Sequence, residues 1–307
     1  MNYVQRKCNL CSAVHHERLY KIKDYHIVRC IKCGFVFLNP GPQQTPAEIY
    51  EKGYFTGDCN QKDTHNVCGW NYFTDENVAA VKLRSRQRLD YFEKFISPGC
   101  LLDIGCGIGI FLAEARSRNW TPYGVDVSDF AVHYAREVLR LSNVEKVDVE
   151  KIDFETDQFD AISMFHVIEH VLDPKALLKT CHRLLKPGGV LFLETPDIST
   201  KRAKDAGINW EYLKIPEHLN YFTNRTLLMT LKDVGFRPIA TRRGVESTGL
   251  LVNLCGSKDN ARRFYENWQS KKWFRLAVEK VRCAKEIYSG MIFKDYDNVA
   301  IIAMKQR

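Results

Sequence analysis

The sequence predicts an α/β fold, in which helices cover both faces of a mainly parallel sheet, with a small cysteine-bearing module ahead of it. Between residues 99 and 238, short apolar runs alternate with segments of helical periodicity, the pattern of repeated strand–helix–strand units. Two C-x-x-C pairs lie within the first 33 residues. A chain of 307 residues can bury one large core and still carry a small appendage.

The elements follow in order from these patterns. A helix is expected over about 77–95, and the alternating region then predicts strands near 100–104, 121–125, 143–147, 159–165 and 189–194, with helices near 109–118, 129–139 and 173–185. A further helix at 227–234 is ended by Gly235, and residues 236–242 and 298–304 predict two more strands. Accordingly, we divide the chain into residues 1–42, an aromatic-rich lid and helix at 43–96, the main domain at 97–245 and 295–307, and a basic helical insertion at 246–294.

The cysteine pairs predict a metal site. Cys8 and Cys11 form one C-x-x-C pair, Cys30 and Cys33 form the other, and 18 residues separate them. Four thiolates complete a tetrahedral structural zinc site, so residues 1–42 are interpreted as a zinc-ribbon module. A redox role is the alternative, but it lacks a thioredoxin-like context. No apolar signal-like segment or membrane-length run occurs, so we expect a reducing, cytoplasmic setting that favours metal over disulfides.

The stretch after the first predicted parallel strand predicts a ligand-binding turn. Gly105, Gly107 and Gly109 form G-x-G-x-G between that strand and a helix, where glycines allow a ligand close to the backbone. The spacing is not the G-x-G-x-x-G fingerprint of dinucleotide sites. Asp103 adds a carboxylate at the position where a nucleotide site would bind a phosphate, and the negative charge disfavours an anionic ligand there. The turn therefore favours a ligand with a cationic group.

Asp126 marks the second half of this site. It ends the next predicted strand, 23 residues after Asp103, where an acidic side chain can bind both hydroxyls of a ribose. A cationic group together with a ribose points to S-adenosylmethionine rather than NAD or ATP.

With these residues, the region from about Ser97 to Pro238 resembles the class I S-adenosylmethionine-dependent methyltransferases. The resemblance rests on LLDIGCGIGIFL, YGVD, FDAISMFH and LKPGG in this order. It implies a Rossmann-like, seven-stranded sheet whose last strand is antiparallel and pairs with the sixth. It also implies that Asp103 and Gly105 approach the methionine amine and Asp126 the ribose. The adenine would then contact Val127, Asp148 and Val149, and Phe165 and His166 would form walls of the site. Asp148 as a plain turn residue is the alternative.

Three histidines are candidates for the chemistry of methyl transfer. His166 and His170 follow the fourth parallel strand, at the mouth of the cofactor crevice. His218 lies in EHLNYF, a segment that recurs near the acceptor in the resembling family, and is our first choice for a general base. Packing for His170, and helix capping or loop ordering for His218, are the alternatives. The zinc-hydrolase spacing H-E-x-x-H is absent, so no catalytic metal is expected. The aromatic residues Tyr54, Phe55, Tyr72 and Phe73 are interpreted as a lid, with core packing as the alternative.

The predicted function is methyl transfer to a small molecule. A zinc ribbon followed by a methyltransferase domain resembles bacterial enzymes that modify sugars, polysaccharides and natural products, which implies O-methylation of such an acceptor. The alternative is an RNA methyltransferase that uses the ribbon and the basic C-terminal segment. The chain carries a net charge of +8, and residues 242–307 hold 14 Lys or Arg against 7 Asp or Glu. The sequence does not indicate an oligomeric state.

Overall fold

The main domain is built on one mixed sheet of seven strands. The computed structural model describes residues 3–42, 50, 52–57, 71–243 and 297–306. The strand order is β12-β13-β10-β9-β6-β7-β8. The strands are β6 (Cys100–Ile104), β7 (Thr121–Asp126), β8 (Val144–Lys146), β9 (Phe159–Phe165), β10 (Leu185–Pro196), β12 (Phe236–Arg243) and β13 (Asn298–Lys305). Strands β6 to β10 are parallel, and β13 runs antiparallel between β10 and β12. The predicted seven-stranded sheet is confirmed, as is its antiparallel last strand that pairs with the sixth.

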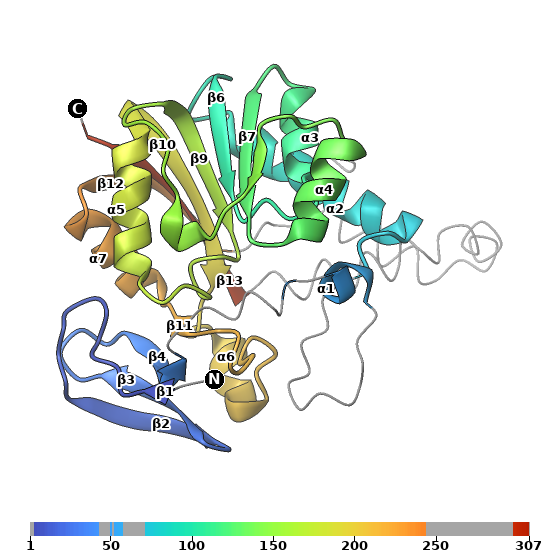
Figure 1. Cartoon of the computed structure of the whole chain (residues 1–307). Helices are drawn as coiled ribbons and strands as arrows, with labels where there is room; N and C mark the ends of the chain where they lie inside the picture. The colour runs from blue at the N-terminus through green and yellow to red at the C-terminus, as the bar shows by residue number, and fades with distance from the viewer. Residues whose placement is uncertain (1–2, 43–49, 51, 58–70, 244–296, 307) are drawn as a thin grey trace, which may run out of the picture.

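Helices cover both faces of this sheet (Figure 1). Successive side chains of a strand point to opposite faces, so each strand contributes to two cores. Leu191 and Leu193 pack in the core that includes α5 (Pro174–Leu184) and α7 (Asn224–Asp233). Val190 and Phe192 pack in the core of α2, α3 and α4. These three helices are α2 (Asp75–Phe92), α3 (Ile110–Arg116) and α4 (Asp129–Glu137). The shorter helical segments are α1 (Lys52–Thr56), α6 (Lys201–Ala206) and the 3-10 turns Val149–Lys151 and Gly207–Asn209.

One strand differs from its prediction. The sequence predicts a turn through LKPGG before a strand at 189–194, whereas β10 already pairs with β9 at Leu185. The register shifts between Leu185 and Val190, and Gly188 adopts φ +82°, so the glycine-containing turn is a bulge within the strand. The predicted helical insertion at 246–294 lies outside the described residues, as does part of the 43–96 segment.

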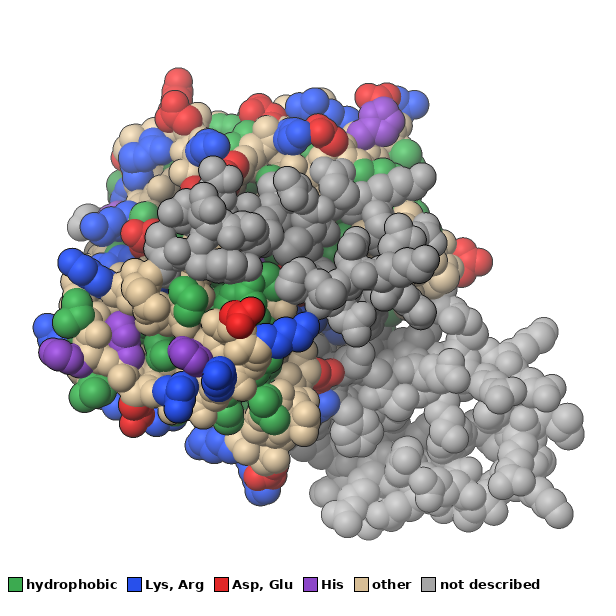
Figure 2. Space-filling view, turned by 60° about the horizontal axis from the view of Figure 1, so that its bottom comes forward, with side chains coloured by type: hydrophobic (Ala, Val, Ile, Leu, Met, Phe, Trp, Pro, Cys, Tyr) green, Lys and Arg blue, Asp and Glu red, His purple; other side chains and the backbone are tan. Residues whose placement is uncertain are grey.

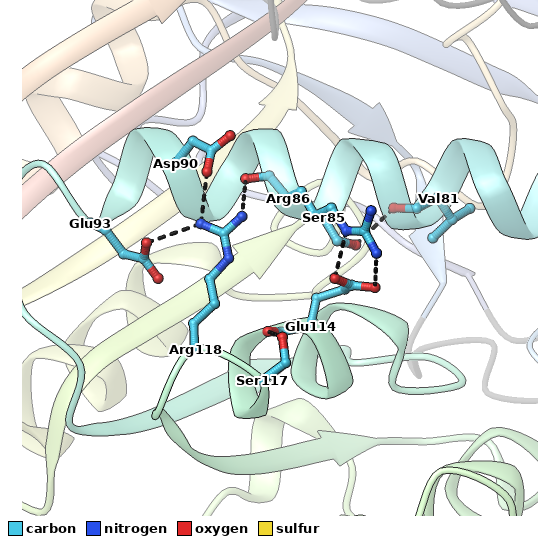
Figure 3. A network of polar contacts seen from close by, with 8 residues as sticks. All are labelled: Val81, Ser85, Arg86, Asp90, Glu93, Glu114, Ser117 and Arg118. Atoms are coloured by element: carbon cyan, nitrogen blue, oxygen red, sulfur yellow. Dashed lines mark hydrogen bonds and ion pairs between the residues drawn. The ribbon is translucent and has the colours of Figure 1, made fainter.

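Helix α2 is fastened along α3 by a polar network (Figure 3). Arg86 holds Glu114 through two contacts of 2.8 and 3.3 Å. Arg118, just after α3, donates to Asp90 of α2 and to Glu93 at the end of that helix, at 2.7 and 3.0 Å. Ion pairs shared among several charges hold geometry better than single surface pairs. The network fixes the position of α2, whose inner face borders the site described below.

The cysteine module forms a second sheet at the N-terminal end of the chain (Figure 1). Its order is β11-β4-β3-β2, with β2 (His16–Ile22), β3 (Tyr25–Cys30), β4 (Val36–Asn39) and β11 (Asn220–Tyr221), and β1 (Tyr3–Val4) pairs with β5 (Gly41–Pro42). Strand β11 belongs to the EHLNYF segment, far downstream, and its pairing with β4 is not anticipated by the sequence. Phe35 and Phe222 share the core that covers one face of the large sheet. The module is therefore continuous with the main domain. Among the described residues, no helix is both long and apolar enough to cross a membrane.

Candidate active site

The glycine turn lies between β6 and α3 and is fastened to the neighbouring strand. Gly105, Gly107 and Gly109 have φ of +71°, +52° and +82°, a region that residues with a Cβ rarely adopt. The amides of Gly105 and Cys106 both donate to the carbonyl of Val125 at the end of β7. A Cβ on Gly105 would lie 2.4 Å from Cγ2 of Val167. The turn is thus closely packed on one side and open to a cavity on the other.

Asp126 is oriented by the same turn. One carboxylate oxygen accepts from the Gly107 amide at 2.8 Å, and the other accepts from the Ser128 amide at 2.9 Å. The side chain is only 7% exposed, and burial raises its pKa against the opposing effect of these amides. Each oxygen keeps a further lone pair, so the carboxylate can accept two hydroxyl groups from a ligand in the cavity.

Asp103 lies at the floor of the same cavity. It is 3% exposed, and the hydroxyl of Ser163 donates to Oδ1 at 2.7 Å. Burial raises the pKa of Asp103 to about 7. A cationic group beside it would favour the charged form, so this carboxyl is suited to an ammonium ligand.

All ten residues predicted to contact the cofactor border one cavity of about 420 Å³. They are Asp103, Gly105, Gly107, Gly109, Asp126, Val127, Asp148, Val149, Phe165 and His166. Of the aromatic lid residues, Tyr54, Phe55 and Tyr72 also line it, whereas Phe73 packs on Phe130 and Tyr134 of α4. Asp148 additionally caps the 3-10 turn Val149–Lys151, because its side chain accepts from the amide of Glu150. The volume is that of a small-molecule site.

His166 is held at the end of β9 with a left-handed backbone, φ +56°. Its Nδ1 lies 3.3 Å from Oε1 of Glu169, and its Nε2 lies 3.4 Å from Oε1 of Glu194. Asn298, the first residue of β13, contacts Nε2 at 3.3 Å. Burial opposes the charged ring, but the two carboxylates outweigh it and raise the pKa of His166 to about 9. His166 is therefore a cation at neutral pH and cannot serve there as a proton acceptor.

Arg88 of α2 completes this charge network. Its guanidinium contacts both oxygens of Glu194, at 2.9 and 3.1 Å, and lies 4.0 Å above the ring of Phe165. Glu194 is buried within β10, where an unpaired carboxylate would be costly. Two cations thus balance Glu169 and Glu194. The sequence analysis did not predict this network. The only feature of the sequence that indicates it is Glu194, a charged residue within an otherwise apolar strand.

His170 and His218 meet in the lining of the same cavity. Their rings lie edge to face with centroids 4.6 Å apart, and Tyr50 and the carbonyl of Glu217 contact Nδ1 of His170 at 2.7 and 3.1 Å. His218 is 4% exposed. Burial lowers the pKa of both rings, and the neighbouring His170 adds to the effect on His218, whose pKa falls well below 6.5. Both rings are neutral at pH 7, so either can accept a proton.

Glu217, which precedes His218, is a buried glutamate. Glu217 is 1% exposed, and neither carboxylate oxygen has a hydrogen-bond partner among the described residues. Burial raises its pKa to about 7. The ammonium of Lys214 opposes part of this effect of burial, and the charge of Glu169 adds to it.

Among the residues that the structure describes, two groups of side chains offer atoms that could hold a metal. The four predicted cysteines place their Sγ atoms within 4.8 Å of one another, with Cys8–Cys33 and Cys11–Cys30 both at 3.5 Å. Glu169, His170 and His218 also have ligand atoms within 4.8 Å. In the second group Glu169 is already neutralised by His166, which weakens its attraction for a further cation.

Comparison with known proteins places this geometry in a family. The sequence matches the family described as "Methyltransferase domain" over residues 75–241. It is 35% identical over 119 residues to a ubiquinone biosynthesis O-methyltransferase of Pseudomonas aeruginosa, covering 37% of this chain and 51% of that protein. For a protein of the same name from Nitrosomonas europaea, identity is 33% over 135 residues, covering 41% and 57%. The chain thus spans about half the length of the curated relatives it matches.

Among solved structures, a SAM-dependent methyltransferase from Archaeoglobus fulgidus superposes with a TM-score of 0.50 at 22% identity, covering 76% of this chain and 96% of that one. This likeness concerns the fold alone. A seven-stranded sheet with a reversed last strand and a glycine turn at the cavity defines the methyltransferase class of α/β proteins. The chain belongs to the methyltransferase domain family.

Proposed function

We propose that the protein transfers a methyl group from S-adenosylmethionine to an oxygen atom of a small molecule. The observation that supports this most is the meeting of two features in one cavity. One part of its lining is the glycine turn with Asp126, and another part is a pair of neutral, buried histidines. The first part suits the methyl donor, and the second suits proton removal from an acceptor.

The donor fits the residues present. Asp126 has free lone pairs for the two ribose hydroxyls, and Asp103 offers a carboxyl to the methionine amine. Val127 and Val149 supply apolar walls for the adenine, and the open side of Gly107 allows close approach. When bound, S-adenosylmethionine supplies a sulfonium methyl group for in-line displacement. The protein aligns the acceptor and excludes water.

His218 is the proposed general base. During methyl transfer, the imidazole of His218 would take up the proton of the acceptor hydroxyl. The ring then releases it to solvent. His170 is fixed by Tyr50 and supports the ring of His218 edge to face. His166, a cation between two glutamates, is proposed as a wall that orients the site.

The acceptor is proposed to be a sugar, polysaccharide precursor or natural-product intermediate. Relatives named as O-methyltransferases of ubiquinone biosynthesis support oxygen as the methylated atom. Glu211 and Lys214 are exposed at the cavity mouth and could contact polar groups of the acceptor.

RNA methylation is the second candidate, and it has less support. On the described part of the face in Figure 2, basic side chains are scattered among acidic and hydrophobic ones instead of forming a continuous field. The basic segment 246–294 lies outside the described residues. An RNA-binding enzyme would lose affinity steeply with salt, because each phosphate contact releases counterions.

The cysteine tetrad is proposed to hold a structural zinc ion. Four thiolates at about 2.3 Å from zinc lie roughly 3.8 Å apart in a tetrahedron. The two contacts of 3.5 Å are close to that value. A closed site of this kind stabilises the fold and leaves no position for a substrate. The expected cytoplasmic location remains a prediction.

The function is tested by donor binding and by the identity of the labelled product. Asp126→Ala should weaken S-adenosylmethionine binding at least tenfold in calorimetry, whereas Asp153→Asn, an exposed control, should not change it. Methyl-labelled donor is then offered to a small-molecule extract and to total RNA from the same cells. Label in the small-molecule fraction supports the proposal. Label confined to RNA, or full affinity in Asp126→Ala, would overturn it.

A further inference from the structure

The side chain of Arg6 bridges the cysteine module and the two backbone segments that carry the paired histidines. Its Nη2 donates to the carbonyl of Leu172 at 2.9 Å, and its Nη1 donates to the carbonyl of Leu219 at 3.3 Å. Longer contacts of 3.5 Å reach the carbonyl of Leu38 and Oδ1 of Asn220. One guanidinium thus reaches three segments of the chain that are distant in sequence.

These acceptors lie next to the candidate catalytic residues. Leu172 follows His170 by two positions, and Leu219 directly follows His218. The rings of the two histidines are 4.6 Å apart, so their relative position depends on how the two segments are held together.

The buried side chain of Asn220 also links the segment that carries His170 to the segment that carries His218. Its side-chain amide donates to the carbonyls of Val171 and Ile168, at 2.6 and 3.2 Å. The amides of Leu219 and Asn220 both donate to the carbonyl of Glu169, at 2.7 and 3.0 Å. Arg6 contacts the outer side of this junction from the cysteine module.

Arg6 itself is held by its own module. Its amide donates to Oδ1 of Asn39 at 2.9 Å, and its guanidinium lies 5.7 Å from the ring centroid of Phe37. A Cβ on Gly41 would lie 2.5 Å from Cδ of Arg6, so the module packs tightly on the side chain. Among the described residues, the hydrogen-bond acceptors of the Arg6 guanidinium are backbone carbonyls and one amide oxygen. The carboxylates of Asp173 and Glu150 act on it only through their charge. The donors of the planar guanidinium lie on three nitrogens and can reach such scattered carbonyls at once, whereas all donors of a lysine ammonium lie on one nitrogen.

We infer that Arg6 is a positioning residue for the histidine pair, through which the cysteine module fixes His170 and His218 at the cavity. This rests on the proposed function in that the pair is taken to act on the acceptor. The module then has a role in the reaction although none of its metal-binding residues borders the cavity.

The test replaces the guanidinium of Arg6 by an ammonium group and so keeps the positive charge. Arg6→Lys is compared with Arg29→Lys, a control in the same module whose exposed side chain pairs only with Glu17 among the described residues. In Arg6→Lys we expect kcat to fall at least tenfold, with the Kd for S-adenosylmethionine within twofold of wild type, since the part of the cavity lining that suits the donor is not touched. The acid limb of the pH–rate profile should move to higher pH, because a loosened His218 is better hydrated.

A second readout does not need the acceptor. In NMR spectra of histidine-labelled protein, the imidazole resonances of His170 and His218 should shift in Arg6→Lys. In Arg29→Lys the same resonances should keep their wild-type positions. If Arg6→Lys does not fold, Gly41→Ala is the second variant, because it displaces the side chain of Arg6 without removing it. Gly41→Ala should shift the same two imidazole resonances. Unchanged resonances, or a kcat within twofold of wild type, would overturn the inference. Failure of methyl transfer by the wild-type protein would instead refute the proposed function, while the resonances would still report on Arg6.

Discussion

The imidazole rings of His170 and His218 meet edge to face, 4.6 Å apart, although 47 residues separate them in the chain. One follows a strand of the large sheet, and the other precedes the strand that joins the cysteine module. Their burial keeps both rings neutral, which is the state that a proton acceptor needs.

Replacing His218 should remove most of the turnover. We expect His218→Gln to lower kcat by about 10²- to 10⁴-fold, the usual contribution of a general base, with little change in donor affinity. In the wild type kcat at saturating donor should stay constant from pH 8 down to below 6.5, because the lowered pKa keeps His218 unprotonated there. Only below that range should it fall. His133→Gln, on the exposed side of α4, is the control. Unchanged kcat in His218→Gln would assign the ring a structural role.

Donor affinity should depend on pH through Asp103. Burial raises the pKa of this carboxyl to about 7, and only its charged form attracts the methionine amine. Affinity should therefore weaken as the pH falls through 7 towards 5.5. Calorimetry at several pH values measures this directly. Asp103→Asn should bind weakly at every pH, and a variant that keeps the wild-type pH dependence would contradict the assignment.

The pair of carboxylates around His166 should make stability pH-dependent. The folded-state pKa of about 9 exceeds the unfolded value near 6.5, so this stabilisation is complete below pH 6.5 and is lost as the pH rises through 9. Its size is at most roughly 3 kcal/mol, because each unit of pKa shift corresponds to about 1.4 kcal/mol. His166→Asn removes the charge and tolerates the left-handed backbone. Urea unfolding between pH 6 and 10 should show a decline in the wild type that the variant lacks.

Metal analysis should find one zinc ion per chain. Cys11→Ser should lower that ratio well below one and reduce Tm by at least about 3 °C, the shift that 1 kcal/mol gives in a domain of this size. Cys100→Ser, at a cysteine outside the tetrad, should retain the metal. A second equivalent of metal, lost on His218→Gln, would instead assign the Glu169–His170–His218 group as a metal site and remove His218 as the base.

The sequence predicts local elements better than contacts between distant ones. Periodicity places the strands at 100–104 and 159–165 with the bounds that the structure has, since apolar runs between turn residues leave few alternatives. The cavity residues follow because the carboxyl ends of parallel strands meet at one edge of the sheet.

The pairing of β11 with β4 could not be predicted in this way. It joins Asn220 to Phe37 across more than 180 residues, and two residues of strand carry no periodicity of their own. The network of Arg88, Glu194 and His166 is likewise assembled from three elements that only the tertiary fold brings together.

Alanine variants of two glycines, Gly105 in the cofactor turn and Gly188 in β10, distinguish backbone strain from steric conflict. Gly105→Ala should lose more stability than Gly188→Ala, because both positions have positive φ but only the Cβ at 105 meets a neighbour, Val167, at 2.4 Å. The strain alone costs about 1–2 kcal/mol, which is all that Gly188→Ala should show in urea unfolding. Gly105→Ala should also weaken donor binding, since Val167 borders the cavity. Adding Val167→Ala should recover the excess loss of stability. Equal losses in the two single variants would mean that Val167 does not restrict the turn.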